Sequence, residues 1–161
     1  MPYISPLPIM LSMTKISFRE PSVDDIQPLA LLMKQLGYPV ELSEMHKNIL
    51  KYSSLKNQKA WVAEVKGEVV GCIAVSITNY FHRDASFLRI ITMVVDEKKR
   101  RMGIGKKLMQ IAEDYAKEKG CSHVELTSGA HRETLGSHRF YESLGYTELS
   151  LKKKYFGKKL D

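Results

Sequence analysis

The sequence has 161 residues, of which 43% are hydrophobic and 27% charged, and its formal net charge is +7. This length and composition predict one globular domain, and they predict neither a disordered chain nor a transmembrane one, since no apolar run approaches the ~20 residues of a membrane span. The charge is concentrated in residues 96–107 and in the tail 151–161, each with a net +4, which favours a compact polyanion as ligand over a long nucleic-acid duplex.

The N-terminal segment 1–13 is expected to be a disordered extension that precedes a single domain over residues 14–161. It contains three prolines and lacks the basic start and the cleavage site of a signal peptide. Met13 is therefore a second candidate for the first residue of the protein. The two cysteines, Cys72 and Cys121, lie far apart and outside any metal-ligand spacing, which predicts free thiols and a cytoplasmic location.

The hydrophobic pattern predicts an α/β (α+β layered) fold, in which a mixed sheet carries helices on its faces. Ser22 is expected to cap a first helix that ends at Gly37, and Pro28 inside it predicts a kink or a later start. Lys66-Gly67 predicts a tight hairpin turn. The expected strands are 16–19, 60–65, 69–78, 87–95, 124–127 and one within 147–155, and the expected helices are 23–35, 44–52, 105–119 and 135–144.

The most informative segment is the loop between the strand 87–95 and the helix that follows, Arg100-Arg101-Met102-Gly103-Ile104-Gly105-Lys106-Lys107. A helix start offers unpaired N–H groups and the positive end of the helix dipole to an anion. Glycines let the backbone approach a phosphate closely. A strand that turns through such a basic loop into a helix therefore predicts a nucleotide-type ligand.

Two motifs together resemble the GCN5-related N-acetyltransferase (GNAT) family over roughly residues 18–155. Residues 100–105 match the pattern R/Q-x-x-G-x-G/A, and residues 137–146 are similar to A-x-x-F-Y-E-x-L-G-F/Y. The resemblance implies a mostly antiparallel sheet of six to seven strands with about four helices and a splayed central cleft. It also implies transfer of an acetyl group from acetyl-CoA to a primary amine by direct attack. Residues 127–133 and 138–141 look like those of bacterial relatives that act on small amines.

The same resemblance implies roles for the matched residues. Backbone N–H groups of the loop would hold the CoA pyrophosphate, and the edge of the strand 87–95 would hydrogen-bond the pantetheine arm. An N–H near Val94 or Val95 would stabilise the oxyanion of a tetrahedral intermediate, and Tyr141 would be the general acid that protonates the leaving thiolate. The residues implied to bind CoA are Met93, Val94, Val95, Arg100, Arg101, Met102, Gly103, Ile104, Gly105, Lys106, Lys107, Ser137 and Phe140.

The family implies acetyl-CoA as cosubstrate without a metal, a small-molecule amine as acceptor and a homodimer, with no nucleic acid or membrane as partner. Thr92 stands where many relatives carry a glutamate base, so a water chain or a residue from elsewhere, such as His82, would take the amine proton. The acceptor candidates, from the first two helices and the loop between the third and fourth strands, are Tyr38, His46, Tyr80, Phe81 and His82.

The acceptor itself stays open between two classes. The basic charge balance favours an anionic small amine, and a protein amine is the second choice. Glu125, which alternates with apolar neighbours, is expected to face the cleft, and the tail lysines are expected to form a solubilising surface. The alternative function is a non-catalytic sensor module that binds acetyl-CoA or a nucleotide.

Overall fold

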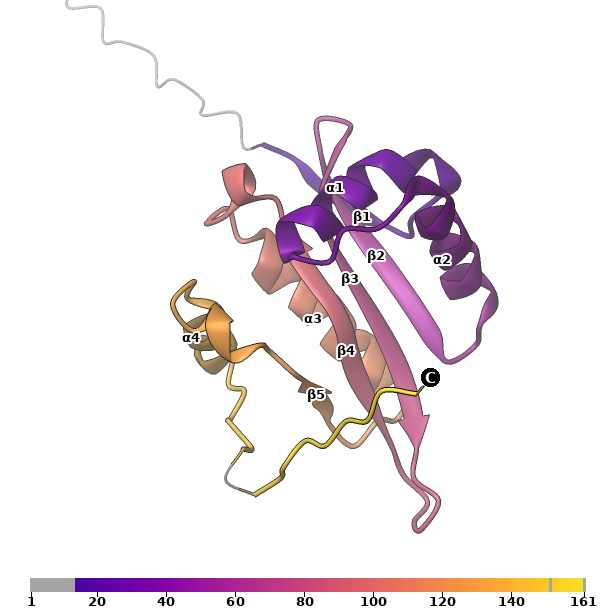
Figure 1. The fold of residues 1–161 in the computed structure, drawn as a ribbon, viewed down its shortest axis with the longest axis vertical. Helices are drawn as coiled ribbons and strands as arrows, with labels where there is room; N and C mark the ends of the chain where they lie inside the picture. The colour runs from indigo at the N-terminus through magenta and orange to yellow at the C-terminus, as the bar shows by residue number, and fades with distance from the viewer. Residues whose placement is uncertain (1–13, 151, 161) are drawn as a thin grey trace, which may run out of the picture. The chain divides into compact units, whose positions relative to one another are not determined.

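Five strands form one sheet in the order β1-β2-β3-β4-β5 (Figure 1). The computed structural model describes residues 14–150 and 152–160. Neighbouring strands from β1 to β4 pair antiparallel. The Ser122 N–H donates to the Ser86 carbonyl, and the Leu88 N–H donates to the His123 carbonyl. The residue numbers of both segments thus increase in the same direction, so β5 runs parallel to β4. The strands are β1 Ile16–Arg19, β2 Gln58–Val65, β3 Glu68–Asn79, β4 Ser86–Val95 and β5 Val124–Leu126.

The chain divides into two compact units between Glu125 and Leu126. The first holds α1, Ile26–Leu36, α2, Leu42–Ser54, and α3, Ile104–Glu118. The second holds α4, Ser137–Ser143. Single 3-10 turns lie at Val23–Asp25, Glu97–Lys99 and Ala130–Arg132. The layered α/β class is thus confirmed, with four α-helices and, among the described residues, five strands instead of six to seven.

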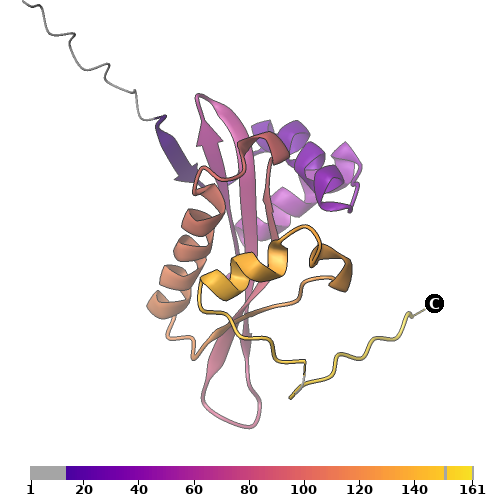
Figure 2. The same ribbon diagram turned by 90° about the vertical axis from the view of Figure 1, so that its left-hand side faces the viewer.

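Helices cover both faces of the sheet, α1 and α2 on one and α3 on the other (Figures 1 and 2). Successive side chains of a strand point to opposite faces. Val62 and Cys72 accordingly pack in one apolar cluster with Leu29 of α1 and Ile49 of α2. Gly71, the neighbour of Cys72, faces α3.

Two contacts place α3 against its face of the sheet. A Cβ on Gly71 would lie 3.3 Å from Leu108 Cδ1 and 3.4 Å from Ile104 Cγ2, so the glycine allows close helix–strand packing. One strand away, the Trp61 ring meets Tyr115 of α3 edge to face, with 5.3 Å between centroids. The start of α3 is thereby held on β3 and its last turn on β2.

A β-bulge interrupts the pairing of β3 and β4. Ala74 pairs with Thr92, but Val75 pairs with Ile90, so Ile91 is the extra residue of β4. A bulge bends its strand and increases the local twist. Ile91 is accordingly half exposed although it lies in a central strand.

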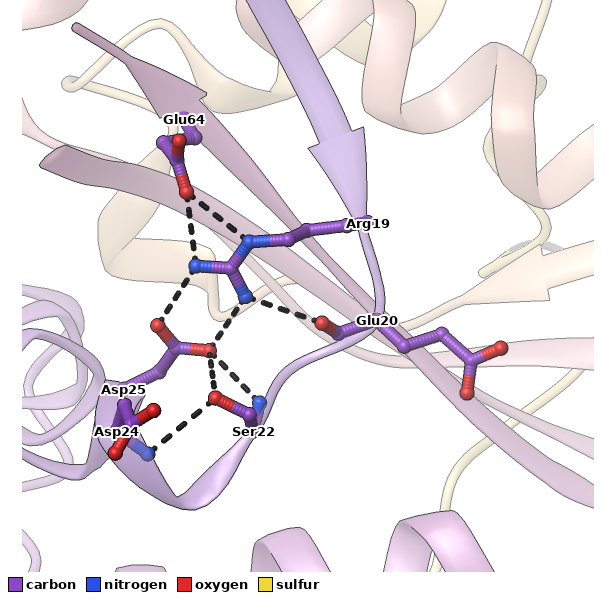
Figure 3. A network of polar contacts seen from close by, with 6 residues as sticks. All are labelled: Arg19, Glu20, Ser22, Asp24, Asp25 and Glu64. Carbon is purple, nitrogen blue, oxygen red and sulfur yellow. Dashed lines mark hydrogen bonds and ion pairs between the residues drawn. The ribbon is translucent and has the colours of Figure 1, made fainter. Parts of the chain in front are cut away.

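The buried Asp25 joins β1, β2 and the start of α1 through Arg19 (Figure 3). Arg19 donates to both Asp25 oxygens, at 2.7 and 2.9 Å, and to one Glu64 oxygen, at 2.8 and 3.0 Å. Asp25 also accepts the Ser22 N–H at 2.8 Å, and Ser22 accepts the Asp24 N–H, which together form a capping box. Hydrogen bonds from Arg19 hold the pKa of Asp25 below its usual range against the effect of burial.

Most predicted elements are confirmed within a few residues. Gly37, at φ 95°, ends α1, and Lys66 and Gly67 both adopt left-handed conformations in the hairpin turn. The predicted later start is confirmed: a 3-10 turn precedes α1, and Pro28 falls in the first turn of α1. A backbone N–H has no intrahelical partner in that turn, so the missing N–H of proline costs no hydrogen bond.

The prediction of a strand within residues 147–155 was wrong. Residues 147–150 and 152–160 form no strand and are exposed throughout, whereas a strand must bury alternate side chains against a partner. The predicted helix 135–144 is shortened to α4, because Gly136 adopts a left-handed φ of 79° directly before it.

The expected extension 1–13 lies outside the described residues, and the single-domain boundary at residue 14 stays a prediction. Within the part of the chain that the structure describes, no helix has both the length and the apolar character to cross a membrane.

Replacement of Asp25 by asparagine should destabilise the fold at neutral pH by about 1–3 kcal/mol, because it removes the charge that Arg19 binds. A carboxyl whose pKa is lowered by folding stabilises the native state above its unfolded pKa, about 3.9 for aspartate. That stabilisation is lost as the pH falls through the folded pKa. The difference in unfolding free energy between wild type and Asp25→Asn, measured by urea denaturation, should therefore shrink below about pH 4.

Asp24→Asn is the matched control, since the exposed Asp24 contributes only its N–H to this network. An equal loss of stability in both variants, or a loss in Asp25→Asn that does not depend on pH, would contradict the assigned role.

Candidate active site

The loop that leads into α3 has an unusual backbone. Arg101 and Gly103 both adopt left-handed conformations, at φ 63° and 77°. Gly103 is the N-cap of α3, and Lys107 makes the first intrahelical bond, to its carbonyl at 3.1 Å. The N–H groups of Ile104, Gly105 and Lys106 therefore have no acceptor within the helix. Because glycine has no side chain, the N-cap residue cannot satisfy them either.

The space in front of this helix start is open and positively charged. A Cβ on Gly103 would meet no atom within 4 Å, and Arg100, Arg101, Lys106 and Lys107 are exposed. The side chain of Ile104 is 1% exposed and anchors the first turn in the core. Open N–H groups, a helix dipole and four cations fit a pyrophosphate group, as the resemblance to the acetyl-CoA-dependent family implies.

The last residues of β4 direct polar backbone groups away from β3. Asp96 donates its N–H to the Val70 carbonyl of β3 at 2.8 Å. In a trans peptide the carbonyl opposes the following N–H, so the Val95 carbonyl points to the other side. A residue in a strand directs its N–H and carbonyl the same way, and every second residue repeats this. The N–H groups of Val95 and Met93 therefore point away from β3 as well, and Arg100 Nε lies 3.4 Å from the Val95 carbonyl.

A pocket of about 380 Å³ lies on the α1–α2 face of the sheet. It reaches from the α1–α2 connection across β2 and β3 to the bulge of β4 at Ile91 and Thr92. All its residues belong to the first compact unit. They are Pro21, Leu29, Met33, Tyr38, Pro39, Val40, Glu44, Met45, Asn48, Ile49, Tyr52, Ala60, Trp61, Val62, Cys72, Ile73, Ala74, Ile91 and Thr92.

Charged groups are scarce in this pocket. Among its described lining residues, Glu44 is the single carboxylate, and none is a lysine, arginine or histidine. Burial raises the pKa of the Cys72 thiol to about 12 and also raises the pKa of the Tyr52 hydroxyl. Both groups are therefore neutral at pH 7.

The structure places only one of the five acceptor candidates at this pocket. Tyr38 lines it, but His46, Tyr80, Phe81 and His82 do not belong to its lining. In the hairpin after Asn79, the rings of Tyr80 and His82 contact each other, with 5.2 Å between their centroids, and Phe81 is fully exposed. Thr92 does line the pocket, whereas the proposed base His82 lies outside it.

Glu125 was also predicted to face the cleft, but it does not line this pocket. Its carboxylate accepts a hydrogen bond from Arg89 at 2.8 Å and lies 3.7 Å from His123 Nε2. Sequence reasoning missed Glu44 and Asn48. Their spacing with Tyr52, four residues apart on α2, puts all three on one helix face, which is the signal that could have found them.

Tyr141 lies on α4 in the second unit. Its ring meets those of Phe140 and Tyr146 edge to face, with 5.3 and 6.2 Å between the ring centroids. Burial raises the pKa of Tyr141, which a nearby Arg132 charge partly offsets. The phenol thus stays protonated at neutral pH, as a general acid requires. The expected roles of Tyr141, Ser137 and Phe140 stay predictions.

Metal coordination has no evident place in the part of the chain that is described. Within residues 14–150 and 152–160, no three His, Cys, Asp or Glu side chains gather in a way that could hold a metal ion.

Comparisons with known proteins agree on one family. A profile of the Acetyltransferase (GNAT) family matches residues 25–146. Probable N-acetyltransferase 14 of Xenopus tropicalis is 31% identical over 127 residues, which cover 78% of this chain and 58% of that protein. The chain spans about half the length of the curated relatives it matches.

Solved structures show the same fold. A transcriptional regulator from Bacillus halodurans C-125 has a TM-score of 0.76 at 24% identity, over 91% of this chain and 99% of that one. Aminoglycoside N-acetyltransferase AAC(6')-Iy in complex with CoA has a TM-score of 0.74 at 18% identity, over 91% and 95% of the two chains. At these identities the likeness concerns the fold alone.

Replacement of Gly103 by glutamate should abolish most of the affinity for acetyl-CoA, because it brings a negative charge to the open helix start. Gly120→Glu is the control, since Gly120 lies just beyond the other end of α3, with a similar φ of 70° and nothing within 4 Å of an added Cβ. Both changes should cost about 1–2 kcal/mol of stability from the left-handed conformation. Calorimetry should show a loss of affinity above about tenfold for Gly103→Glu alone. Equal affinities of the two variants would exclude the loop as the binding site.

Proposed function

The chain belongs to the GNAT acetyltransferase family, and from this we propose that it transfers the acetyl group of acetyl-CoA to the primary amine of a small molecule. The observation that carries the proposal is the arrangement along β4. The pocket reaches Ile91 and Thr92, outward-pointing N–H groups follow at Met93 and Val95, and the anion-binding loop begins at Arg100. From Thr92 to Val95 is only about 10 Å along a strand. Acceptor, pantetheine arm and pyrophosphate would thus lie in sequence along one strand and its loop.

The shape of the pocket supports a small molecule over a protein amine. Its volume, about 380 Å³, falls in the range of about 300–1,000 Å³ of sites that enclose small ligands. A protein lysine would have to insert into this concave site from outside. A small amine fits within its volume.

The proposed reaction is a direct attack. The amine gives a proton to a chain of water molecules, its nitrogen attacks the thioester carbonyl and forms the C–N bond, the C–S bond breaks, and the thiolate receives a proton from Tyr141. The outward N–H of Val95 or Met93 would stabilise the oxyanion. Cys72 is the thiol that lines the pocket, and its pKa of about 12 makes it a poor nucleophile at neutral pH. This supports transfer without an acetyl-cysteine intermediate. The expected cytoplasmic location and homodimer stay predictions.

The experiment that tests the proposed function is release of free thiol from acetyl-CoA with a panel of small amines and peptides, with product identity checked by mass spectrometry. Release that depends on the amine, together with the acetylated amine as product, would support it. Binding of acetyl-CoA by calorimetry without release above hydrolysis for any member would contradict it and favour the non-catalytic sensor.

Replacement of Tyr141 by phenylalanine should lower kcat by about 10²-fold or more, the contribution of a positioned acid, with little change in KM. Because the acid acts while protonated, activity should be lost as the pH rises through the pKa of Tyr141. Burial raises this pKa above the ordinary value. The basic limb of the pH–rate profile should therefore lie above the ordinary pKa of tyrosine, and it should change in the variant. The exposed Tyr155→Phe serves as the control and should keep wild-type kinetics. A Tyr141→Phe enzyme with most of its kcat would make Tyr141 a packing residue.

A further inference from the structure

The segment that leads from β4 to the loop before α3 is held by a side chain from another element. Gln35 lies in the last turn of α1 and donates from Nε2 to Asp96 Oδ2 at 2.9 Å, while its Oε1 accepts the Glu97 N–H at 3.1 Å. These partners are 61 and 62 positions away in the sequence, and all three residues belong to the first compact unit. The end of α1 is thus joined to the turn Glu97–Lys99, which directly precedes Arg100.

The Gln35 amide has one orientation that satisfies both of its hydrogen bonds. The ionised Asp96 carboxylate can only accept and the Glu97 N–H can only donate, so Nε2 faces Asp96 and Oε1 faces Glu97. Asp96 also accepts the Lys98 N–H, on Oδ1 at 2.9 Å. The hydrogen bond from Gln35 lowers the pKa of Asp96, and the Lys98 N–H lowers it further against the effect of burial. The carboxylate is therefore ionised at neutral pH, and both bonds to it are charge-assisted.

The backbone of Asp96 connects this contact with the sheet. Its N–H donates to the Val70 carbonyl of β3 at 2.8 Å, and its carbonyl accepts the Lys99 N–H at 2.9 Å. One residue thus ends the pairing of β4 with β3, begins the 3-10 turn and receives the side chain of Gln35. The path by which the chain leaves β4 is therefore fixed by α1 as well as by the sheet.

The loop has a second anchor at its far end. Ile104 is buried in the core at the first turn of α3. Between the two anchors lie residues 100–103, which include the left-handed Arg101 and Gly103. Backbone N–H groups cannot move one by one to meet a ligand, so the affinity of such a site depends on how closely its backbone is held in position.

We propose that Gln35 is a positioning residue for CoA, which holds Asp96 and the Glu97 N–H and thereby keeps the loop 100–107 in the conformation that binds the pyrophosphate. The inference rests on the part of the proposed function that assigns the CoA pyrophosphate to this loop. In this role Gln35 acts through the turn, without a contact of its own with CoA. The amine acceptor takes no part, so CoA alone is a sufficient probe.

The first test removes both hydrogen bonds of Gln35 with little change in the size of the side chain. In Gln35→Met, calorimetry should show an affinity for CoA that is lower by about three- to tenfold, the equivalent of a lost hydrogen bond. Gln27→Met is the control, because it makes the same exchange at an exposed position in the first turn of the same helix. It should bind CoA as the wild type does. Equal affinities of the two variants would overturn the inference.

A reciprocal exchange separates the contact from the effect of charge. Gln35→Glu sets two carboxylates against each other. In Asp96→Asn, any rotation of the two amides leaves two donors facing each other, because Glu97 and Lys98 both present N–H groups. In Gln35→Glu/Asp96→Asn, the amide at position 96 donates to the carboxylate at position 35, whose other oxygen accepts the Glu97 N–H, and the net charge is that of the wild type.

Each single variant should bind CoA at least about threefold more weakly, and the double variant should recover the wild-type affinity. By charge alone, Asp96→Asn should instead bind the anionic CoA more tightly, since it removes a negative charge beside the loop. An affinity of Asp96→Asn equal to or above that of the wild type would overturn the inference. A double variant that binds no better than Gln35→Glu would overturn it as well.

A shorter donor distinguishes positioning from a general loss of structure. S-acetylpantetheine carries the same thioester without the pyrophosphate, so Gln35→Met should raise KM for acetyl-CoA and leave kcat/KM for S-acetylpantetheine unchanged. An equal loss with both donors would contradict the positioning role. If the CoA affinities change as expected but no amine releases thiol, acetyl transfer fails and the role of Gln35 stands. If amines release thiol but the CoA affinities do not change, the proposed function stands and this inference fails.

Discussion

The close approach of α3 to β3 at Gly71 is the constraint on which the candidate site depends. A Cβ at this position would lie 3.1 Å from the Val94 carbonyl oxygen of β4, 3.3 Å from Leu108 Cδ1 and 3.4 Å from Ile104 Cγ2, so a larger residue would crowd both β4 and the start of α3. The N–H groups of Ile104, Gly105 and Lys106, which are the candidate anion site, belong to the first turn of α3, and the strand edge that precedes them is the end of β4. A shift of α3 would therefore separate the loop from the strand edge with which it forms the candidate binding surface. Because core packing is dense, such a shift would also disturb both layers of the core.

The bulge in β4 connects this surface with the pocket on the opposite face. Strand periodicity alone would place every second side chain of β4 on the face of α3. The extra residue, Ile91, resets the alternation so that Thr92 shares a face with Ala74 and Cys72. The pocket is thus continued onto β4 within a few residues of the outward N–H groups of Met93 and Val95. A single inserted residue thus brings the pocket close to the strand edge that is the candidate binding site for the pantetheine arm.

Local signals in the sequence predicted most of the fold, because they act over a few residues. The Ser22 cap, the Lys66-Gly67 turn and the apolar face of α3 each have a local physical cause. The strand within 147–155 failed because alternating residues such as Leu149 and Tyr155 imitate a strand, whereas strand formation depends on a distant partner. The loop 100–107 was found for the same reason as the caps, since its residues are contiguous.

The pocket could not be predicted in this way, because its residues are spread over positions 21–92 and each resembles an ordinary residue of an amphipathic helix or strand. Tyr80 and His82 attracted attention by residue type, yet the hairpin carries them beyond the paired ends of β3 and β4. The left-handed Arg101 has a further consequence. An L-residue in this conformation costs about 1–2 kcal/mol, and folding has already met that cost. Folding thus sets the loop conformation in advance, so that the anion expected there would not have to order the loop, which would favour affinity through entropy.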